Sequence, residues 1–306
     1  MGAEIQSSLP ANAILIAGPT AVGKSEVALL LAEKLGGEII SVDSMQVYRG
    51  LDIGTAKPES SEQARVPHHL IDILDVTESF NAATFVRLAT AAVNDIVRRA
   101  KTPILCGGTG LYFQALLGGL GQAPRPDPVL RAELEGSPSD QLLEELAVRD
   151  PTTHASIDRA NRRRLVRAVE VIRLTGKPFS SMRSDWSQAG SSNRRFLLTR
   201  ASNDLQRRID IRVDAMFQKG LVTETGQMLA SGLEKNRSAS QALGYRQVIE
   251  HLAGQRSLDQ TIELVRVRTR QFAKRQLTWF RKHGHWNSIK LEQSDSAERV
   301  VERIRG

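Results

Sequence analysis

An eight-residue glycine-rich motif limits the fold of this chain more than any other segment. It has the spacing G-x-x-x-x-G-K-S and consists of Gly18, Pro19, Thr20, Ala21, Val22, Gly23, Lys24 and Ser25. An apolar run at 13–17 precedes it and a helical pattern at 24–35 follows, which is the context of a phosphate-binding loop. Its backbone N–H groups and the helix N-terminus would hold a di- or triphosphate, Lys24 would add charge, and the Ser25 hydroxyl would bind a phosphate-bound Mg²⁺. The motif alone leaves open which phosphate compound binds and whether phosphate is transferred.

Two polar residues follow other predicted strands. Asp43 comes directly after the apolar run 38–42, and Thr109 lies in a glycine-rich turn after the run 103–106. Ligands of open α/β sheets bind at the carboxyl ends of the strands, so we expect both side chains in the crevice of the phosphate loop. Asp43 is then a general base or a water-mediated magnesium ligand, or else a turn-capping residue. Thr109 faces the same ligand, or else caps the next helix.

The segment 44–60 has neither a helical nor a strand period. Long irregular segments in compact domains are usually functional or disordered, and this one is too specific in residue type for a flexible linker. We therefore expect a substrate-contacting loop with four polar side chains, those of Tyr48, Arg49, Thr55 and Lys57. The pair His68-His69 has no second ligand pair at metal-site spacing, which favours a structural role, and the next residues, 70–74, are expected to form a strand.

The pattern of alternating strands and helices stops at Gly118. The following residues are rich in glycine and proline, and three helices are then expected, at 129–135, 140–148 and 161–174. Strand and helix patterns resume at Arg195. The predicted fold class is α/β, a P-loop NTPase-like parallel sheet core from 1–119 and 195–306, with an inserted all-helical domain at 120–194.

The third helix of the predicted insertion carries a basic patch. Arg163, Arg164 and Arg167 lie within one turn of each other, while Leu165 and Val166 belong to its buried side. Such a patch suits the phosphate backbone of a nucleic acid, although a charge run is usually only a solvated face. The net charge of +8 agrees with a polyanionic partner.

A second pair of arginines lies at helical spacing after the insertion. Arg208 and Arg212 are four residues apart in a predicted helix at 204–218, so they share a face and could clamp a diphosphate. Glu224 could instead pair with one of them. Another helix is expected to open at Gln241, and a long one spans 258–282. The long helix has an apolar stripe beside basic ones, and its Trp279-Phe280 pair is expected in the core.

Composition narrows the class of protein further. The single cysteine, Cys106, excludes an internal disulfide and a multi-cysteine zinc site, and is expected to be a small buried residue. No apolar run approaches the ~20 residues of a membrane span, and residues 1–12 lack an apolar signal core. We therefore expect a cytoplasmic protein that does not contact a membrane.

Several blocks of the sequence resemble one family, the bacterial tRNA dimethylallyltransferases, also called tRNA isopentenyltransferases. The most specific block is 43–58, DSMQVYRGLDIGTAKP. Others are PHHLID at 67–72, GGTGLY at 107–112, RRLVRAVEV at 163–171, TGKP at 175–178, QALGY at 241–245 and AKRQLTWFR at 273–281. They cover nearly the whole chain in family order. One departure is Ala160-Asn161, where the family usually has Asn-Asp. The C-terminal zinc finger of eukaryotic relatives is ruled out by the single cysteine, which points to a bacterial form.

The resemblance implies transfer of a dimethylallyl group from dimethylallyl diphosphate to N6 of adenosine 37 of tRNA, with Mg²⁺. The diphosphate would bind the loop 18–25 with Arg208 and Arg212, and Asp43 would accept a proton from N6. Thr109 would hydrogen-bond the diphosphate or help to orient the reacting groups. The anticodon stem-loop of a tRNA would be bound by a monomer. Its expected contacts are Asp43, Ser44, Met45, Gln46, Thr109, Arg131, Arg163, Arg164, Leu165, Val166, Arg167, Ser240, Gln241, Ala242, Leu243, Gly244, Tyr245, Arg246 and Gln247.

Three other functions compete with this one. The phosphate loop alone would suit an ATP-dependent small-molecule kinase, which leaves the basic insertion unexplained. An isopentenyltransferase acting on free adenylate shares a similar core, but a free nucleotide needs no RNA-gripping insertion. A non-catalytic RNA-binding relative would not need the phosphate loop together with Asp43 and Thr109.

Overall fold

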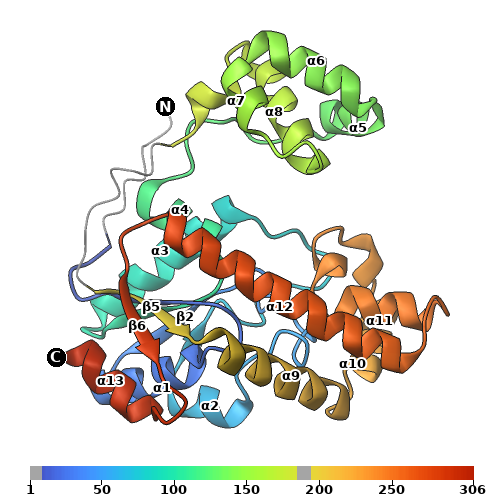
Figure 1. The fold of residues 1–306 in the computed structure, drawn as a ribbon. Coiled ribbons are helices and arrows are strands. Elements are labelled where there is room, and N and C mark those ends of the chain that lie inside the picture. Colours follow the sequence, from blue (N-terminus) through green and yellow to red (C-terminus); the bar gives the residue numbers. More distant parts are fainter. Residues whose placement is uncertain (1–8, 185–193) are drawn as a thin grey trace. The chain divides into compact units, whose positions relative to one another are not determined.

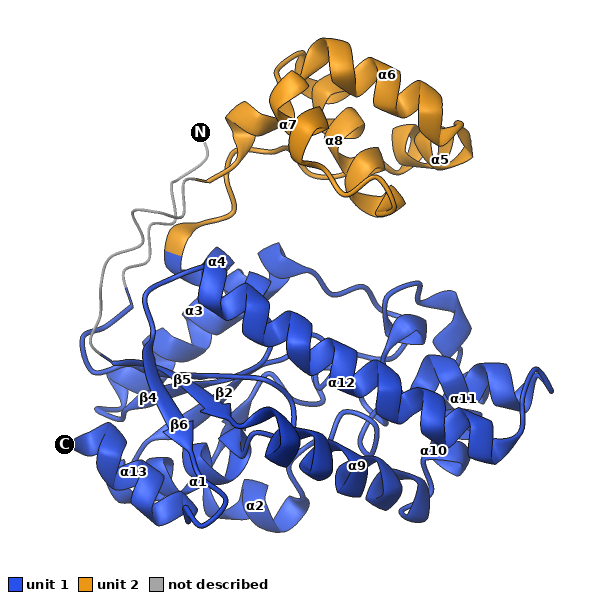
Figure 2. Ribbon diagram, viewed as in Figure 1, with its two compact units in different colours: residues 1–117, 189–306 blue, residues 118–188 orange. Residues whose placement is uncertain are grey.

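The computed structural model describes residues 9–184 and 194–306 of the chain. The chain divides into two compact units, one formed by 1–117 and 189–306 and the other by 118–188 (Figure 2). The expected boundary at 119/120 lies two residues from the observed one. The expected boundary at 194/195 lies next to 185–193, which are outside the described residues.

The first unit is built on a six-stranded sheet (Figure 1). Every neighbouring pair of its strands is parallel, in the order β3-β2-β4-β1-β5-β6. The strands are β1 (Ile14–Ala17), β2 (Glu38–Val42), β3 (His68–His69), β4 (Pro103–Gly107), β5 (Arg195–Arg200) and β6 (Asn287–Leu291). The expected parallel α/β core is confirmed.

Helices pack on both faces of the sheet. They are α1 (Lys24–Leu35), α2 (Ser60–Arg65), α3 (Ala82–Arg98), α4 (Gly110–Gly118), α9 (Ser202–Gln218), α10 (Leu221–Ala230), α11 (Tyr245–Leu252), α12 (Leu258–Lys282) and α13 (Ala297–Arg305). Capping residues explain where two of these helices begin and end. The Asn81 side chain accepts hydrogen bonds from backbone N–H groups in the first turn of α3, as expected. Helix α1 ends at Gly36, whose backbone is in the left-handed region.

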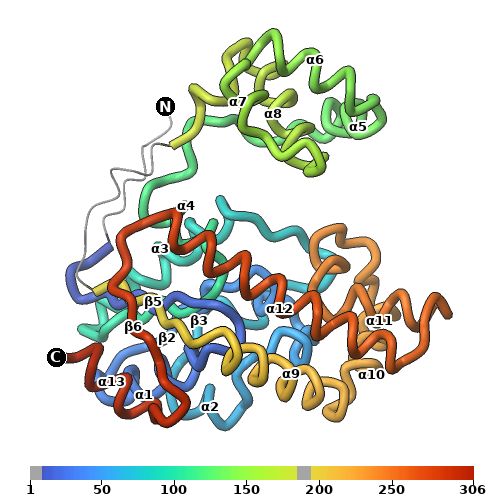
Figure 3. Tube along the Cα trace, in the orientation of Figure 1, coloured from blue at the N-terminus to red at the C-terminus, as the bar shows by residue number. Residues whose placement is uncertain are grey.

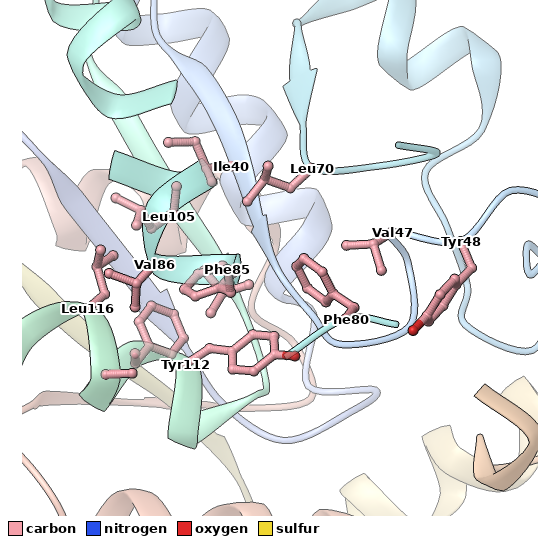
Figure 4. Close-up of a cluster of buried hydrophobic side chains, with 14 of the residues drawn as sticks. Ile40, Val47, Tyr48, Leu70, Phe80, Phe85, Val86, Leu105, Tyr112 and Leu116 are labelled. Atoms are coloured by element: carbon pink, nitrogen blue, oxygen red, sulfur yellow. The ribbon is translucent and has the colours of Figure 1, made fainter. Parts of the chain in front are cut away.

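Alternation of side chains along the strands produces two hydrophobic cores. Leu15 points into a core with α3, α4, α10 and α11, whereas Ile14 and Ile16 point into a core with α1, α9 and α13. Figure 4 shows part of the first core, where the Phe85 and Tyr112 rings stack with centroids 4.5 Å apart. Because both faces of the sheet are covered, the central strand β1 (sequence ILIA) is apolar throughout and fully buried.

Two sequence predictions about local structure are wrong. Residues 70–74 do not form a strand, because Leu70 and Asp72 have backbone φ angles of 62° and 54°, which interrupt an extended chain. The helix expected to open at Gln241 begins at Tyr245, after a 3₁₀ turn at Ala239–Gln241. The long helix α12 has the predicted bounds, and Figure 3 traces it along the first unit.

The second unit is helical, as expected. It contains α5 (Pro128–Gly136), α6 (Ser139–Arg149), α7 (Pro151–Ser156), α8 (Arg162–Thr175) and a 3₁₀ turn, η1 (Phe179–Met182). Leucines of α5 and α6 pack against the apolar face of α8 in a core separate from those of the sheet. The unit therefore has a hydrophobic core of its own. None of the helices among the described residues is long and apolar enough to cross a membrane.

Candidate active site

Strand order places the predicted site residues at one edge of the sheet. The strands β2, β4, β1 and β5 are consecutive neighbours, and their register aligns Val42, Gly107, Ala17 and Leu197 near their carboxyl ends. The next segments are therefore also neighbours: Asp43, the Thr109 turn, the phosphate loop and Arg200. The sequence prediction that the first three share one crevice follows from this order.

The phosphate loop presents backbone N–H groups to a ligand. Gly18 and Gly23 have φ angles of 154° and 108°, and Ala21 has a φ of 63°, which is unusual for a residue with a Cβ. Gly23 stands at the N-cap of α1 and has no side chain to cap it. The first N–H groups of α1 are thus left for an anion, which the helix dipole also favours.

Side chains from distant elements brace this loop. Arg208 Nε donates to the Ala21 carbonyl at 2.9 Å, and Arg200 Nε donates to the Val22 carbonyl at 2.9 Å. Gln276 of α12 is buried, accepts from Thr20 N at 2.8 Å and donates to the Gly108 carbonyl at 2.9 Å. Gln276 therefore ties the phosphate loop to the Thr109 turn. Sequence analysis gave no role to Arg200 or Gln276.

Lys24 and Arg212 form the cationic side of the crevice. Lys24 Nζ donates to the Pro19 carbonyl at 2.7 Å, and burial lowers the pKa of its ammonium to about 8, with a smaller contribution from Arg212. Burial also lowers the pKa of the Arg212 guanidinium, and the charge of Asp43 opposes this shift. A diphosphate would neutralise both cations, which makes Arg212 the better candidate for direct contact, while Arg208 supports the loop. Glu224 bonds elsewhere, so the alternative that it pairs with either arginine is wrong.

Asp43 caps a turn, which is one of the roles considered for it. Its Oδ1 accepts from Met45 N at 2.8 Å and from Gln46 N at 3.3 Å, which caps the turn after β2. Within the described ranges, no hydrogen bond reaches its second carboxylate oxygen. One oxygen thus fixes the carboxylate and the other can accept a proton. Thr109 directly precedes α4, and its backbone carbonyl accepts from Tyr112 N and Phe113 N in the first turn of that helix.

The loop after Asp43 differs from the expectation. Its polar side chains were expected to contact substrate, but Tyr48 is buried and Thr55 Oγ1 donates to the Leu51 carbonyl. Lys57 Nζ donates to the Tyr48 carbonyl at 2.9 Å. The same ammonium forms ion pairs with Asp52 and Asp72. Arg49 pairs with Asp75. The Gln46 side chain, also expected at the tRNA, bonds to Ser41 and to the Thr55 and Ala56 carbonyls. The side chains of Tyr48, Lys57 and Gln46 therefore help to build the loop, whereas that of Arg49 is exposed.

The basic patch of the insertion separates into two groups. Arg131 and Arg167 both donate to the buried carboxylate of Glu170, each at 2.6 Å. Arg163 and Arg164 are exposed in the first turn of α8. Leu165 and Val166 are buried in the core of this unit, so their side chains are not at its surface.

The segment Ser240–Gln247 is also mixed. Gln241 and Arg246 are exposed and hydrogen-bonded to each other, and Ser240 and Leu243 are partly exposed. The side chains of Ala242, Tyr245 and Gln247 are buried, and so is Gly244. Further along, a groove on α12 is lined mainly by basic and aromatic side chains, those of Lys274, Arg275, Trp279, Lys282 and His283, together with the polar Gln271 and Thr278. Both Trp279 and Phe280 were expected in the core. Phe280 is buried there, but Trp279 is only partly buried.

The remaining candidates have structural roles. His69 Nε2 contacts the buried Glu38 carboxylate at 2.7 Å and His68 Nδ1 contacts the Val66 carbonyl at 2.7 Å, which confirms the structural interpretation. Cys106 lies beside Lys24, and burial raises the pKa of its thiol to about 11. Among the described residues there is no cluster of three His, Cys, Asp or Glu side chains that could hold a metal ion.

Comparisons with known proteins identify the family of this chain. Residues 46–283 match the family model described as IPP transferase, and the chain therefore belongs to the IPP transferase family. It is 48% identical over 273 residues to tRNA dimethylallyltransferase 1 of Citrifermentans bemidjiense, which covers 89% of both chains. It is 44% identical over 301 residues to tRNA dimethylallyltransferase of Halorhodospira halophila, which covers 96% of both.

Solved structures show the same fold. The full-length tRNA isopentenylpyrophosphate transferase of Bacillus halodurans is 38% identical, with a TM-score of 0.70, and the match covers 96% of this chain and 94% of that one. A eukaryotic dimethylallyltransferase acting on tRNA is 28% identical, with a TM-score of 0.78, over 94% of this chain and 77% of that one.

Proposed function

We propose that this protein transfers a dimethylallyl group from dimethylallyl diphosphate to N6 of adenosine 37 in the anticodon loop of tRNA. The observation that carries the proposal is that a phosphate-binding loop and a half-anchored carboxylate follow the carboxyl ends of β1 and β2, the two strands that flank β4. Membership of the IPP transferase family and the named relatives support the same reaction. An ATP-dependent kinase and a free-adenylate transferase explain the basic helical unit less well.

The reaction needs charge stabilisation on one side and a base on the other. N6 attacks the allylic carbon, the bond from that carbon to the diphosphate oxygen breaks, and the diphosphate leaves with the electron pair. Lys24, Arg212 and the N-terminus of α1 stabilise the negative charge of the leaving group. Asp43 takes the N6 proton through its second oxygen, which matters because the lone pair of an exocyclic amine is delocalised. Thr109 orients the reacting groups.

Mg²⁺ is part of this proposal. Ser25 is exposed in the first turn of α1, directly after Lys24. A single hydroxyl, in a chain whose described residues hold no metal-binding cluster of His, Cys, Asp or Glu, fits an ion that keeps several waters and binds mainly to substrate phosphates. The ion would shield diphosphate charge when bound.

The basic surfaces of the protein suit the anticodon stem-loop. Arg163 and Arg164 stand at the N-terminal end of α8, where the helix dipole disfavours cations, so a phosphate there would relieve both charges. The α12 groove adds Lys274, Arg275 and Lys282 beside Trp279, a combination that suits unstacked nucleotides. Adenosine 37 must leave its stack to reach Asp43. We further propose that the protein acts as a monomer in the cytoplasm.

The role of Asp43 is tested by replacing it with alanine. Transfer to the stem-loop should fall by about 10³-fold, because the base is lost, while stem-loop affinity stays within about 2-fold. Single-turnover rates and filter binding measure the two quantities. A near-normal rate would remove Asp43 as the base.

A further inference from the structure

Two residues far from the phosphate loop, Glu224 of α10 and Tyr245 at the start of α11, hold the loop that follows Asp43. Glu224 Oε2 accepts from Ile53 N at 2.9 Å, and Tyr245 OH donates to Glu224 Oε1 at 2.6 Å. The same hydroxyl accepts from Gly54 N at 3.1 Å. Two backbone N–H groups of the loop therefore end on one carboxylate–phenol pair.

Packing at Gly54 makes this attachment specific. A Cβ at Gly54 would lie 2.4 Å from the Tyr245 ring, so the ring can sit against the loop only because this residue is glycine. Tyr245 is fully buried, and burial together with Glu224 raises the pKa of its hydroxyl, which keeps the phenol protonated as a donor. The pair is thus a fixed anchor and not a surface contact.

Hydrogen bonds continue from this anchor to the proposed base. The residues after Gly54 present the Thr55 and Ala56 carbonyls, which accept from Gln46 Nε2 at 3.2 and 3.3 Å. The backbone N–H of Gln46 donates to Asp43 Oδ1 at 3.3 Å. The side-chain Oε1 of Gln46 accepts from the Ser41 hydroxyl near the end of β2. An unbroken series of bonds links α10 and α11 to the Asp43 carboxylate.

We propose that Tyr245 and Glu224 are positioning residues that set the orientation of the Asp43 carboxylate through the 51–56 loop and Gln46. This inference rests on the proposed function of Asp43 and goes beyond it, because it assigns to Tyr245 a buried role in the chemical step instead of the RNA contact expected from the sequence. A carboxylate displaced by a fraction of an ångström transfers protons less efficiently, while substrate binding is unaffected.

The variant Tyr245→Phe removes the hydroxyl and keeps the ring. We expect the single-turnover rate of transfer to fall about 10-fold, with the dissociation constants of the stem-loop and of dimethylallyl diphosphate changed less than about 2-fold. Glu224→Gln should reduce the rate similarly, since the amide offers one acceptor where the carboxylate offers two. Tyr48→Phe is the matched control: Tyr48 is also a fully buried tyrosine of this region, but its hydroxyl lies outside the series of bonds, so the rate should not change.

A double-mutant cycle with Asp43→Asn decides how Tyr245 acts. If Tyr245 works through Asp43, the double variant is as slow as Asp43→Asn alone, measured with excess enzyme. Two independent rate losses, a Tyr245→Phe enzyme with normal rate, or a loss confined to stem-loop affinity would each overturn the inference. A normal rate for Asp43→Asn alone would instead overturn the proposed role of Asp43, so the two failures are distinguishable.

Discussion

The two loops of the site, 18–25 and 43–58, are held in place by different kinds of contact. The phosphate loop leads into the uncapped N-terminus of α1 and is held from outside by Arg200, Arg208 and Gln276. The loop 43–58 is held from inside by Lys57 and Gln46 and from outside by Glu224 and Tyr245. The comparison teaches that a motif dense in polar residues need not be a contact surface. In this protein it is the support for one carboxylate.

The largest expected effect is on the phosphate loop. Lys24→Ala should lower the kcat/KM for dimethylallyl diphosphate by about 10³-fold, because a preorganised charge facing the leaving group is lost. Stem-loop affinity should not change. Steady-state kinetics and filter binding would check this, and equal losses in both would mean that Lys24 supports the fold.

The loop 43–58 should respond in stability before it responds in binding. Lys57→Met removes an ammonium whose side chain is only 3% exposed, and the Tyr48 carbonyl then keeps the longer hydrogen bond from Leu51 N, at 3.4 Å, but loses the one from Lys57. We expect the free energy of unfolding to fall by about 2–3 kcal/mol in urea denaturation. If stability is unchanged and substrate affinity falls instead, Lys57 contacts substrate after all.

The same contrast between supporting and contacting residues divides the arginines of the insertion. The double variant Arg163→Ala/Arg164→Ala should weaken stem-loop binding by about 10-fold at low salt and reduce the slope of log affinity against log salt by about 2. Arg131→Ala should instead destabilise its unit, since Glu170 would lose one of its two partners. Unchanged affinity for the double variant would make the exposed pair a solvated face.

The last prediction concerns how the affinity for diphosphate depends on pH. In the free protein the pKa of Lys24 is lowered to about 8, and a bound diphosphate raises it, so binding above pH 8 must take up a proton. The affinity for diphosphate should be constant below pH 7 and fall by up to about 10-fold per unit above pH 8. Calorimetric titration at several pH values measures this, and a flat profile up to pH 10 would contradict it.

Much of the site could be predicted because its residues belong to short sequence motifs that directly follow predicted parallel strands. The phosphate loop, Asp43 and Thr109 each follow an apolar run, and parallel strands place such residues at one edge. Gln276 could not be found in this way, because it meets Thr20 from 256 residues away and nothing local marks it. Sequence also does not tell whether a polar side chain faces the surface or the interior. Tyr48, Lys57 and Tyr245 have polar side chains that point inward. The strand expected at 70–74 failed on backbone angles that residue types there did not indicate.

Single-turnover transfer from labelled dimethylallyl diphosphate tests the central claim most directly. The enzyme is offered an unmodified anticodon stem-loop with adenosine 37 in one reaction and free AMP in another, with Mg²⁺ in both. We predict label in the stem-loop only. Label in AMP would make the protein a free-adenylate transferase, and no transfer together with consumption of ATP would return the phosphate loop to a kinase; either result contradicts the account.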